Sequence, residues 1–122
     1  MTSTIQATLC ISSESITAEE IGKRINLTAS RTGEPKGDNS DWRFFLDSAL
    51  DETESIELQI EFLCALLEER KQQIASFPQD VIISIWCTID SDREFTGFSL
   101  NAVLMGRVAI IPADVIFSVY KS

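Results

Sequence analysis

The amino-acid sequence predicts an α+β fold, a single layer of antiparallel or mixed sheet with helices on one face, of the ferredoxin-like kind. Two kinds of segment follow one another along the chain. In one kind apolar and polar residues alternate, and in the other apolar residues recur at helical spacing. The length of 122 residues fits one α+β domain that spans residues 1–122 and buries one core. The predicted order of elements is β-α-(β)-β-α-β-α-β.

The first strand and the first helix have clear boundaries. Residues Thr4–Ser12 alternate apolar and polar side chains, which predicts a half-buried strand. Thr17 and Glu20 form a capping box, so a helix is predicted to start at about Ala18. This helix can stop at Asn26.

A loop and a second strand follow. Residues 28–41 have no apolar periodicity and contain Gly33, Pro35 and Gly37, so we interpret them mostly as loop, with room for a short edge strand near the start. The segment Trp42–Asp47 alternates again, which predicts a strand covered on one face and partly covered on the other.

A long helix is predicted next. Asp51 and Glu54 form a second capping box at its start, and Phe77 and Pro78 end it. One row of apolar residues on this helix would cover the sheet, and a second row would pack against the third helix, with a homodimer or partner contact as the alternative. The second row consists of Leu58, Phe62 and Leu66.

The same helix carries a narrow acidic stripe. The stripe consists of Glu54, Glu57, Glu61 and Glu68. No basic residue occurs between Asp51 and Glu69 to neutralise it. The whole chain has 19 acidic and 10 basic residues, a net charge of −9 and a pI near 4.3. This charge disfavours nucleic acid as a partner and favours a basic protein, while acidity for solubility alone is the simpler alternative.

Three further elements complete the predicted fold. Residues 80–90 are apolar on both alternating sets, which predicts a central strand buried on both faces. Ser99 is a good N-cap for a third helix, and Pro112 ends it. Residues 114–121 have the β-propensity of a last strand.

Residues with catalytic potential are few. The chain contains no histidine, which excludes Ser-His-Asp and Cys-His arrangements and removes the commonest metal ligand. No catalytic residue and no cofactor is therefore predicted. Trp42 and Trp86 occupy apolar positions of predicted strands, so core packing is their expected role, and ligand stacking in an open cleft is the alternative.

A second acidic group follows the predicted central strand. Asp90, Asp92 and Glu94 stand at alternate positions, where carboxylates can collect Mg²⁺ or Ca²⁺. An EF-hand loop would need Gly and Glu where Phe95 and Asn101 stand, so a solvated turn is favoured over a metal site. The three acidic residues remain candidate partner-binding residues, together with the helical stripe.

A cytoplasmic location without membrane contact is expected. The sequence has no apolar run of a membrane span's length and begins with neither a basic leader nor a long apolar stretch. Cys10, Cys64 and Cys87 are widely spaced in apolar segments, which is typical of buried thiols rather than of disulfides or a zinc site.

Several segments together resemble a known bacterial family. They are the helix headed by SITAEEIGKRINL, the loop with GEPKGD, the strand DWRFFL, the helix ETESIELQIEFLCALLEERKQQI and a terminal strand with Tyr120. In this combination the chain is similar to the domain family DUF4279 over nearly its whole length. The resemblance implies a standalone α+β domain, offers no catalytic residues to transfer, and makes a role as the immunity protein of a neighbouring toxin conceivable.

The expected function rests on the concentration of acidic residues and on the lack of a catalytic motif. The protein is expected to be a non-enzymatic binding module of immunity or regulatory type, a monomer or homodimer, which docks a basic protein partner through the helical stripe. The alternative is a regulatory domain that binds a small molecule or a divalent metal in a cleft near Trp86 and the acidic group at 90–94. A carboxylate-dependent hydrolase is a third possibility.

Overall fold

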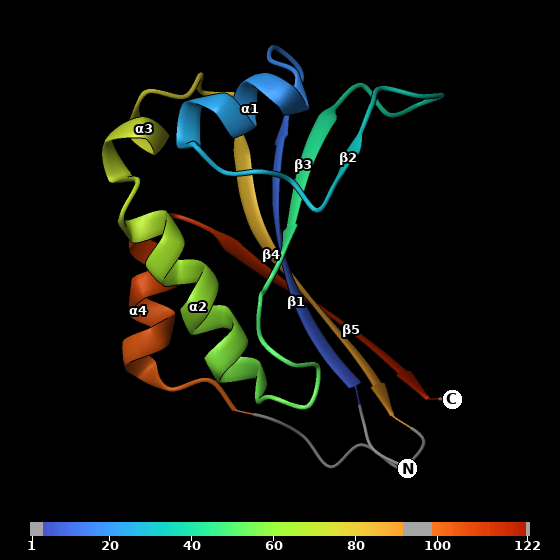
Figure 1. Ribbon diagram of the computed structural model, residues 1–122, viewed down its shortest axis with the longest axis vertical. Coiled ribbons are helices and arrows are strands. Elements are labelled where there is room, and N and C mark those ends of the chain that lie inside the picture. Colours follow the sequence, from blue (N-terminus) through green and yellow to red (C-terminus); the bar gives the residue numbers. More distant parts are fainter. Residues whose placement is uncertain (1–3, 92–98, 122) are drawn as a thin grey trace.

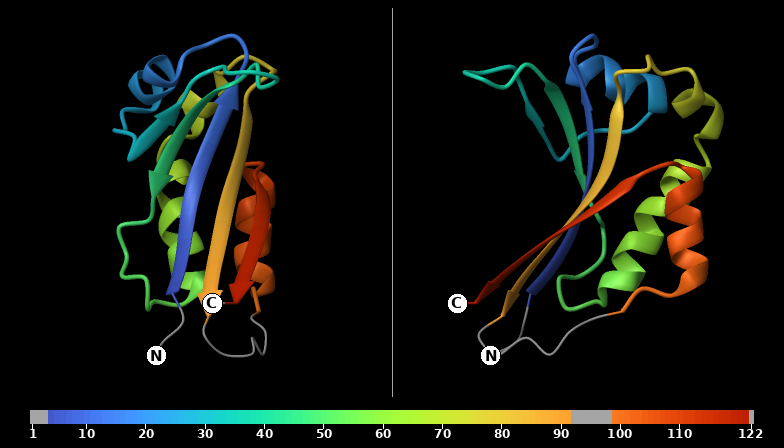
Figure 2. Two further views of the ribbon diagram at one scale, coloured as in Figure 1. Left: turned by 90° about the vertical axis from the view of Figure 1, so that its right-hand side faces the viewer. Right: turned by 180° about the vertical axis from the view of Figure 1, so that it is seen from behind.

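The computed structural model describes residues 4–91 and 99–121, in which one open five-stranded sheet carries four helices on one face. Figure 1 shows the helices on one side of the sheet, and Figure 2 shows the opposite face of the sheet without a covering layer. The predicted α+β class is therefore confirmed. The elements are β1 (Thr4–Ser13), α1 (Ala18–Ile25), β2 (Arg31–Gly33), β3 (Trp42–Asp47), α2 (Ile56–Glu68), α3 (Lys71–Ala75), β4 (Ile82–Ser91), α4 (Ala102–Ile110) and β5 (Asp114–Lys121).

The sheet is mixed, with strand order β2-β3-β1-β4-β5. β1 lies in the middle and pairs antiparallel with β3 and β4. β5 pairs parallel with β4, as the intervening helix α4 allows. This order does not by itself establish a likeness to ferredoxin-like folds.

The core lies between the helix-facing side of the sheet and the helices. Alternate residues of the two longest strands point into it, and apolar residues of α1, α2 and α4 meet them there. Fully buried members include Leu9, Ile11, Ile21, Ile25, Phe44, Ile60, Leu63, Leu67, Ile85 and Ile89. The three cysteines are buried free thiols, as predicted.

Helix α1 has the predicted boundaries. The backbone N–H of Glu20 donates to the side chain of Thr17 over 3.2 Å, which is the expected N-cap bond. Asn26 follows the helix in the left-handed conformation, with φ of 55°. The cap prediction succeeds because both signals are local to the helix ends.

The long predicted helix starts later than expected. Ser55 is its N-cap and accepts a hydrogen bond from the N–H of Leu58 over 3.2 Å. Asp51 caps a turn instead, because its side chain accepts from both the N–H and the hydroxyl of Thr53 at 2.8 Å. The prediction that α2 opens at the Asp51 capping box is therefore wrong.

The same predicted helix is also broken before its expected end. α2 ends at Glu68 and α3 begins at Lys71, because Arg70 takes a non-helical backbone conformation between them. The guanidinium of Arg70 donates to the carbonyl of Ile25 at the end of α1 over 2.6 Å and to that of Leu66 over 2.9 Å. These bonds satisfy carbonyls at two helix ends, a long-range role that sequence periodicity does not show.

Helix α4 is shorter than predicted. Its N-cap is Asn101 rather than Ser99, and the Asn101 side chain accepts from the N–H of Leu104 over 2.8 Å. The helix ends at Ile110, two residues before the predicted stop at Pro112. Asparagine is as favourable an N-cap as serine, so residue preference alone does not distinguish Asn101 from Ser99.

β4 is covered on one face only, which corrects the prediction of a strand buried on both faces. On the open side, Ile82 is 56% exposed and Trp86 is 38% exposed. Trp86 is held there by an edge-to-face contact with Phe45, whose ring centre lies 6.1 Å away, and by a hydrogen bond to Ser84. The apolar residues on both sets of β4 therefore reflect an aromatic cluster on the open face and not a second helix layer.

The first residues of β1 extend beyond the end of β3, whose pairing stops opposite Thr8. A loop provides hydrogen-bond partners for the backbone of β1 there. The N–H of Ile5 donates to the carbonyl of Glu52 over 2.8 Å, and the N–H of Ser48 donates to the carbonyl of Ala7 over 3.0 Å.

Gln59 of α2 satisfies the remaining backbone groups of this part of β1. Its Oε1 accepts from the N–H of Ala7 at 2.7 Å and from the hydroxyl of Ser48 at 2.9 Å. Its Nε2 donates to the carbonyls of Ile5 at 2.6 Å and Glu54 at 3.3 Å. The side chain is fully buried, and its amide group is fully used.

Candidate functional site

Three residues of the acidic stripe predicted from the sequence lie along the junction of α2 and α4, whereas Glu54 precedes the Ser55 N-cap and lies outside α2, so its predicted place on the helix is wrong. We call the whole stripe the acidic surface, and it consists of Glu54, Glu57, Glu61 and Glu68. Glu57 accepts a hydrogen bond from the side-chain amide of Asn101 over 2.7 Å. The stripe therefore does not lie on an isolated solvent face of α2, because three of its members contact α4.

Arg107 of α4 is the cation of the acidic surface. Its Nε and Nη2 donate to the two carboxylate oxygens of Glu68 at 2.9 and 2.7 Å, and its Nη1 lies 3.5 Å from Glu61. The hydrogen bonds from Arg107 hold the pKa of Glu68 below its ordinary value, and the same pair raises the pKa of Arg107. The four carboxylates and the Arg107 guanidinium carry a formal sum of three negative charges, and Lys71 lies close enough to lower the pKa of Glu68 further.

A small hollow lies within the acidic surface. It has a volume of ≈ 260 Å³ and is lined by Glu61, Asn101, Val103, Leu104 and Arg107. Its wall combines the Glu61 carboxylate and the Arg107 guanidinium, 3.5 Å apart, with the Asn101 amide and two apolar side chains. The wall therefore carries one negative and one positive charge.

The second apolar row of α2 is only partly covered. Phe62 and Leu66 are half-buried against the core, whereas Leu58 is 48% exposed. The expectation that the whole row packs against the third helix is wrong for Leu58. Hydrogen bonds join the acidic side chains of α2 to Arg107 and to Asn101, the N-cap residue of α4.

The structure does not bring the second predicted acidic group to the acidic surface. Asp90 is exposed near the end of β4, where its backbone pairs with Thr4 on one side and Tyr120 on the other. By strand alternation its side chain is on the open face of the sheet, as Trp86 is. Asp92 and Glu94 lie outside the described residues. Within 4–91 and 99–121, no group of three acidic or cysteine side chains is placed to hold a metal ion.

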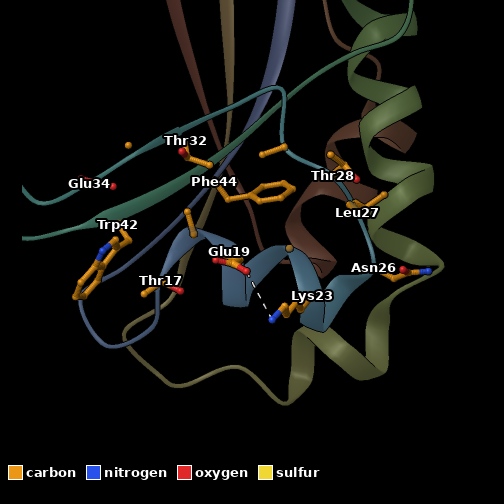
Figure 3. A pocket seen from close by; sticks show the side chains of 14 residues that line it. Thr17, Glu19, Lys23, Asn26, Leu27, Thr28, Thr32, Glu34, Trp42 and Phe44 are labelled. Carbon is orange, nitrogen blue, oxygen red and sulfur yellow. Dashed lines mark ion pairs between the residues drawn. The ribbon is translucent and has the colours of Figure 1, made fainter.

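A larger cleft, which the sequence did not predict, lies between α1, β2 and β3. Its volume is ≈ 710 Å³. Figure 3 shows Trp42 at one end of the cleft and Leu27 with Thr28 at the other, with Phe44 between them. Hydroxyl groups and the exposed Glu19–Lys23 ion pair, 3.6 Å between charged atoms, supply the polar part of the lining.

Trp42 is half-buried in the wall of this cleft, so core packing does not describe its role. The cleft exists because β2 contains only three residues and ends where the 34–41 loop begins, so α1 has no long strand to pack against on this side. Close packing occurs only further in, where a side chain at Gly22 would meet the Leu27 carbonyl at 2.9 Å and Phe44 at 3.2 Å. Two sequence observations pointed to an open surface here, the glycines and proline of the loop and the alternative that Trp42 stacks on a ligand.

These features define a small α+β domain with an acidic helical surface and one cleft beside its shortest strand. The family model described as "Domain of unknown function (DUF4279)" matches residues 3–122, and the chain belongs to this family. A search of the curated proteins finds no match, and a search of the solved structures finds none either. Among the described residues, the longest helix has 13 residues, and no helix is long and apolar enough to cross a membrane.

Proposed function

We propose that the protein is a non-enzymatic binding module, of regulatory or immunity type, that docks a basic protein partner on the acidic surface. The observation that carries the proposal is the excess of carboxylates along α2, where Glu57 is hydrogen-bonded to an amide and Glu61 shares the guanidinium of Arg107 with Glu68. A lysine or arginine of a partner would complete the pairing there, and complementary potentials would speed the encounter. The buried free thiols support a reducing compartment such as the cytoplasm as the site of action.

The test neutralises the acidic surface without removing hydrogen-bonding groups. In the triple variant Glu54→Gln, Glu57→Gln, Glu61→Gln, the surface loses three charges while the Arg107–Glu68 pair stays intact. The wild-type chain is immobilised, a lysate of the native cells is passed over it at low salt, and retained basic proteins are identified and purified. We expect their association rate with the triple variant to fall about tenfold or more, and the salt dependence to weaken.

A matched control changes the net charge equally at the other end of the sheet. The variant Glu14→Gln, Glu34→Gln, Asp38→Asn alters exposed residues of the two loops near α1 and β2. It should leave the association rate close to that of the wild type. Equal rates for both triple variants would show that the partner is not held by the acidic surface.

A second candidate function is supported by the cleft with Trp42. An indole ring in the wall, hydroxyl groups of Thr17, Thr28 and Thr32, and an apolar floor are the elements of a site for a small molecule with a flat ring. Binding there would make the protein a ligand-responsive regulatory domain, as the alternative from the sequence anticipated, at a different location.

Tryptophan fluorescence during a screen of ring-containing metabolites tests this second function. A true cleft ligand should shift the emission of the wild type and of Trp86→Phe, and should give no signal with Trp42→Phe. A signal that persists in Trp42→Phe would place the ligand elsewhere.

A further inference from the structure

The cleft between α1, β2 and β3 has an excess of negative charge. Three charged side chains line it, Glu19, Lys23 and Glu34. Lys23 is paired with Glu19 over 3.6 Å, whereas the Glu34 side chain has no ion pair or hydrogen bond within residues 4–91 and 99–121. The lining of the cleft therefore contains one carboxylate that no cation of the described chain neutralises.

The two arginines of β2 and β3 do not supply the missing cation. Side chains alternate along β3, so Arg43 lies on the opposite face of the sheet from Trp42, which lines the cleft. Arg31 is also on that open face, where its guanidinium lies 5.0 Å from the centre of the Phe45 ring and 3.0 Å from the carboxylate of Asp47. Both guanidinium groups are therefore separated from the cleft by the sheet.

The first turn of α1 also borders the cleft. A helix N-terminus has a partial positive charge, which by itself favours an anion. Glu19 and Glu20 occupy this turn, and the side chain of Thr17 accepts a hydrogen bond from the N–H of Glu20. The two carboxylates oppose the helix dipole, so this helix end does not make the cleft a site for an anion.

An aromatic ring lies near the unpaired carboxylate. Figure 3 shows Trp42 and Glu34 at the same end of the cleft, away from Leu27 and Thr28. The face of an indole ring attracts cations more strongly than that of any other aromatic side chain, and a carboxylate forms strong hydrogen bonds with cationic N–H groups. A ligand with a cationic group on a flat ring would use both side chains at once.

We infer that the ligand of this cleft is an organic cation, in which an ammonium or amidinium group is attached to a flat ring. The inference rests on the second candidate function, the binding of a small ring-containing molecule here, and adds the charge of that molecule. The volume of ≈ 710 Å³ is ample for such a ligand. The net charge of −9 on the whole chain favours the approach of a cation over that of an anion.

Three probes of nearly the same shape separate the effect of charge from that of the ring. Benzamidine is cationic at neutral pH, benzamide is neutral and benzoate is anionic. Each is titrated to about 20 mM into the isotope-labelled full chain at low salt, while nuclear magnetic resonance follows the indole N–H signals of Trp42 and Trp86. Trp86 lies on the open face of the sheet, so its signal, identified with the variant Trp86→Phe, is an internal control.

Benzamidine should move the Trp42 signal with a dissociation constant of about 1 mM, as expected for a ligand of this size. It should bind about fivefold more tightly than benzamide or benzoate, which is the effect of one exposed ion pair. Glu34→Gln should remove this preference and leave the affinity for benzamide unchanged. The matched control Asp38→Asn removes a charge from the same loop at an exposed residue that does not line the cleft, and should change the affinity for benzamidine by about twofold or less.

A preference for benzamidine that Glu34→Gln abolishes and Asp38→Asn preserves would support the inference. Equal binding of the three probes at Trp42 would overturn it and leave the ring site of the second candidate function in place. A preference that survives Glu34→Gln, or that Asp38→Asn abolishes equally, would also overturn it. If no probe moves the Trp42 signal, or if each probe moves the Trp86 signal equally, the cleft is not a ring-binding site and both proposals fail.

Discussion

At the residue scale, Gln59 shows how one buried polar side chain specifies a local structure. It closes the backbone hydrogen bonding of β1 where β3 no longer pairs, through bonds to Ile5 and Ala7. Buried groups of this kind contribute little when paired and cost much when one partner is removed. The alignment of α2 on β1 therefore depends on this amide as well as on apolar packing.

Replacing Gln59 with leucine tests this role. The variant leaves the buried N–H of Ala7 and the half-buried carbonyl of Ile5 without their Gln59 partner, so the free energy of unfolding should fall by about 2–4 kcal/mol. Urea denaturation measures the loss. Gln72→Leu, at an exposed position of α3, is the control and should change stability by about 0.5 kcal/mol or less. Equal stability of the two variants would contradict the role given to the buried amide.

At the element scale, the caps of α1 were predictable and the division of the long helix was not. Thr17 and Asn26 bond to backbone groups of the same helix, so both caps can be predicted from residues that are neighbours in the sequence. Arg70 acts on the carbonyl of Ile25, 45 residues away in the chain, and no local pattern contains that contact. The same reason explains why Asp51 caps a turn although it resembles a helix start.

Alanine substitutions at the two helical glycines are predicted to change the free energy of unfolding in opposite directions. Gly22→Ala in α1 should destabilise the fold by about 1–3 kcal/mol, because the added carbon would meet the Leu27 carbonyl at 2.9 Å. Gly106→Ala in α4 should raise the stability of the fold by about 0.5–1 kcal/mol, because the added carbon meets nothing and alanine favours helix. Urea denaturation measures both. Two changes of the same sign would show that the environment of one of the two glycines differs from that described.

At the scale of the whole molecule, the acidic groups connect stability to pH. Hydrogen bonds lower the pKa of Asp51 through Thr53, of Glu68 through Arg107 and of Asp80 through Ser15. A carboxyl whose pKa is lower in the folded chain stabilises the fold above its ordinary value, and this contribution is lost as pH falls through the lowered value. The bonds of Asp80 are notable because they join the loop after β1 to the start of β4.

The midpoint of thermal unfolding should therefore fall as pH decreases below about 4, and should change little between about 5 and 8, where a chain without histidine has few groups to titrate. Circular dichroism during heating at each pH measures this. Asp80→Asn should lower the midpoint at pH 7 and reduce the additional loss at pH 3. An unchanged acid dependence in that variant would show that Asp80 does not contribute.

The sequence by itself determined the α+β class, most strand positions, the ends of α1 and the burial of the cysteines, because periodicity and caps depend on residues that are neighbours in the chain. Only the tertiary structure decided that Trp42 lines a cleft, that Trp86 lies on an open sheet face, and that Arg107 neutralises part of the acidic surface. The Arg107–Glu68 pair joins residues 39 positions apart. Such contacts depend on how the elements pack against one another, and a one-dimensional pattern shows which face of an element is apolar without showing what covers it.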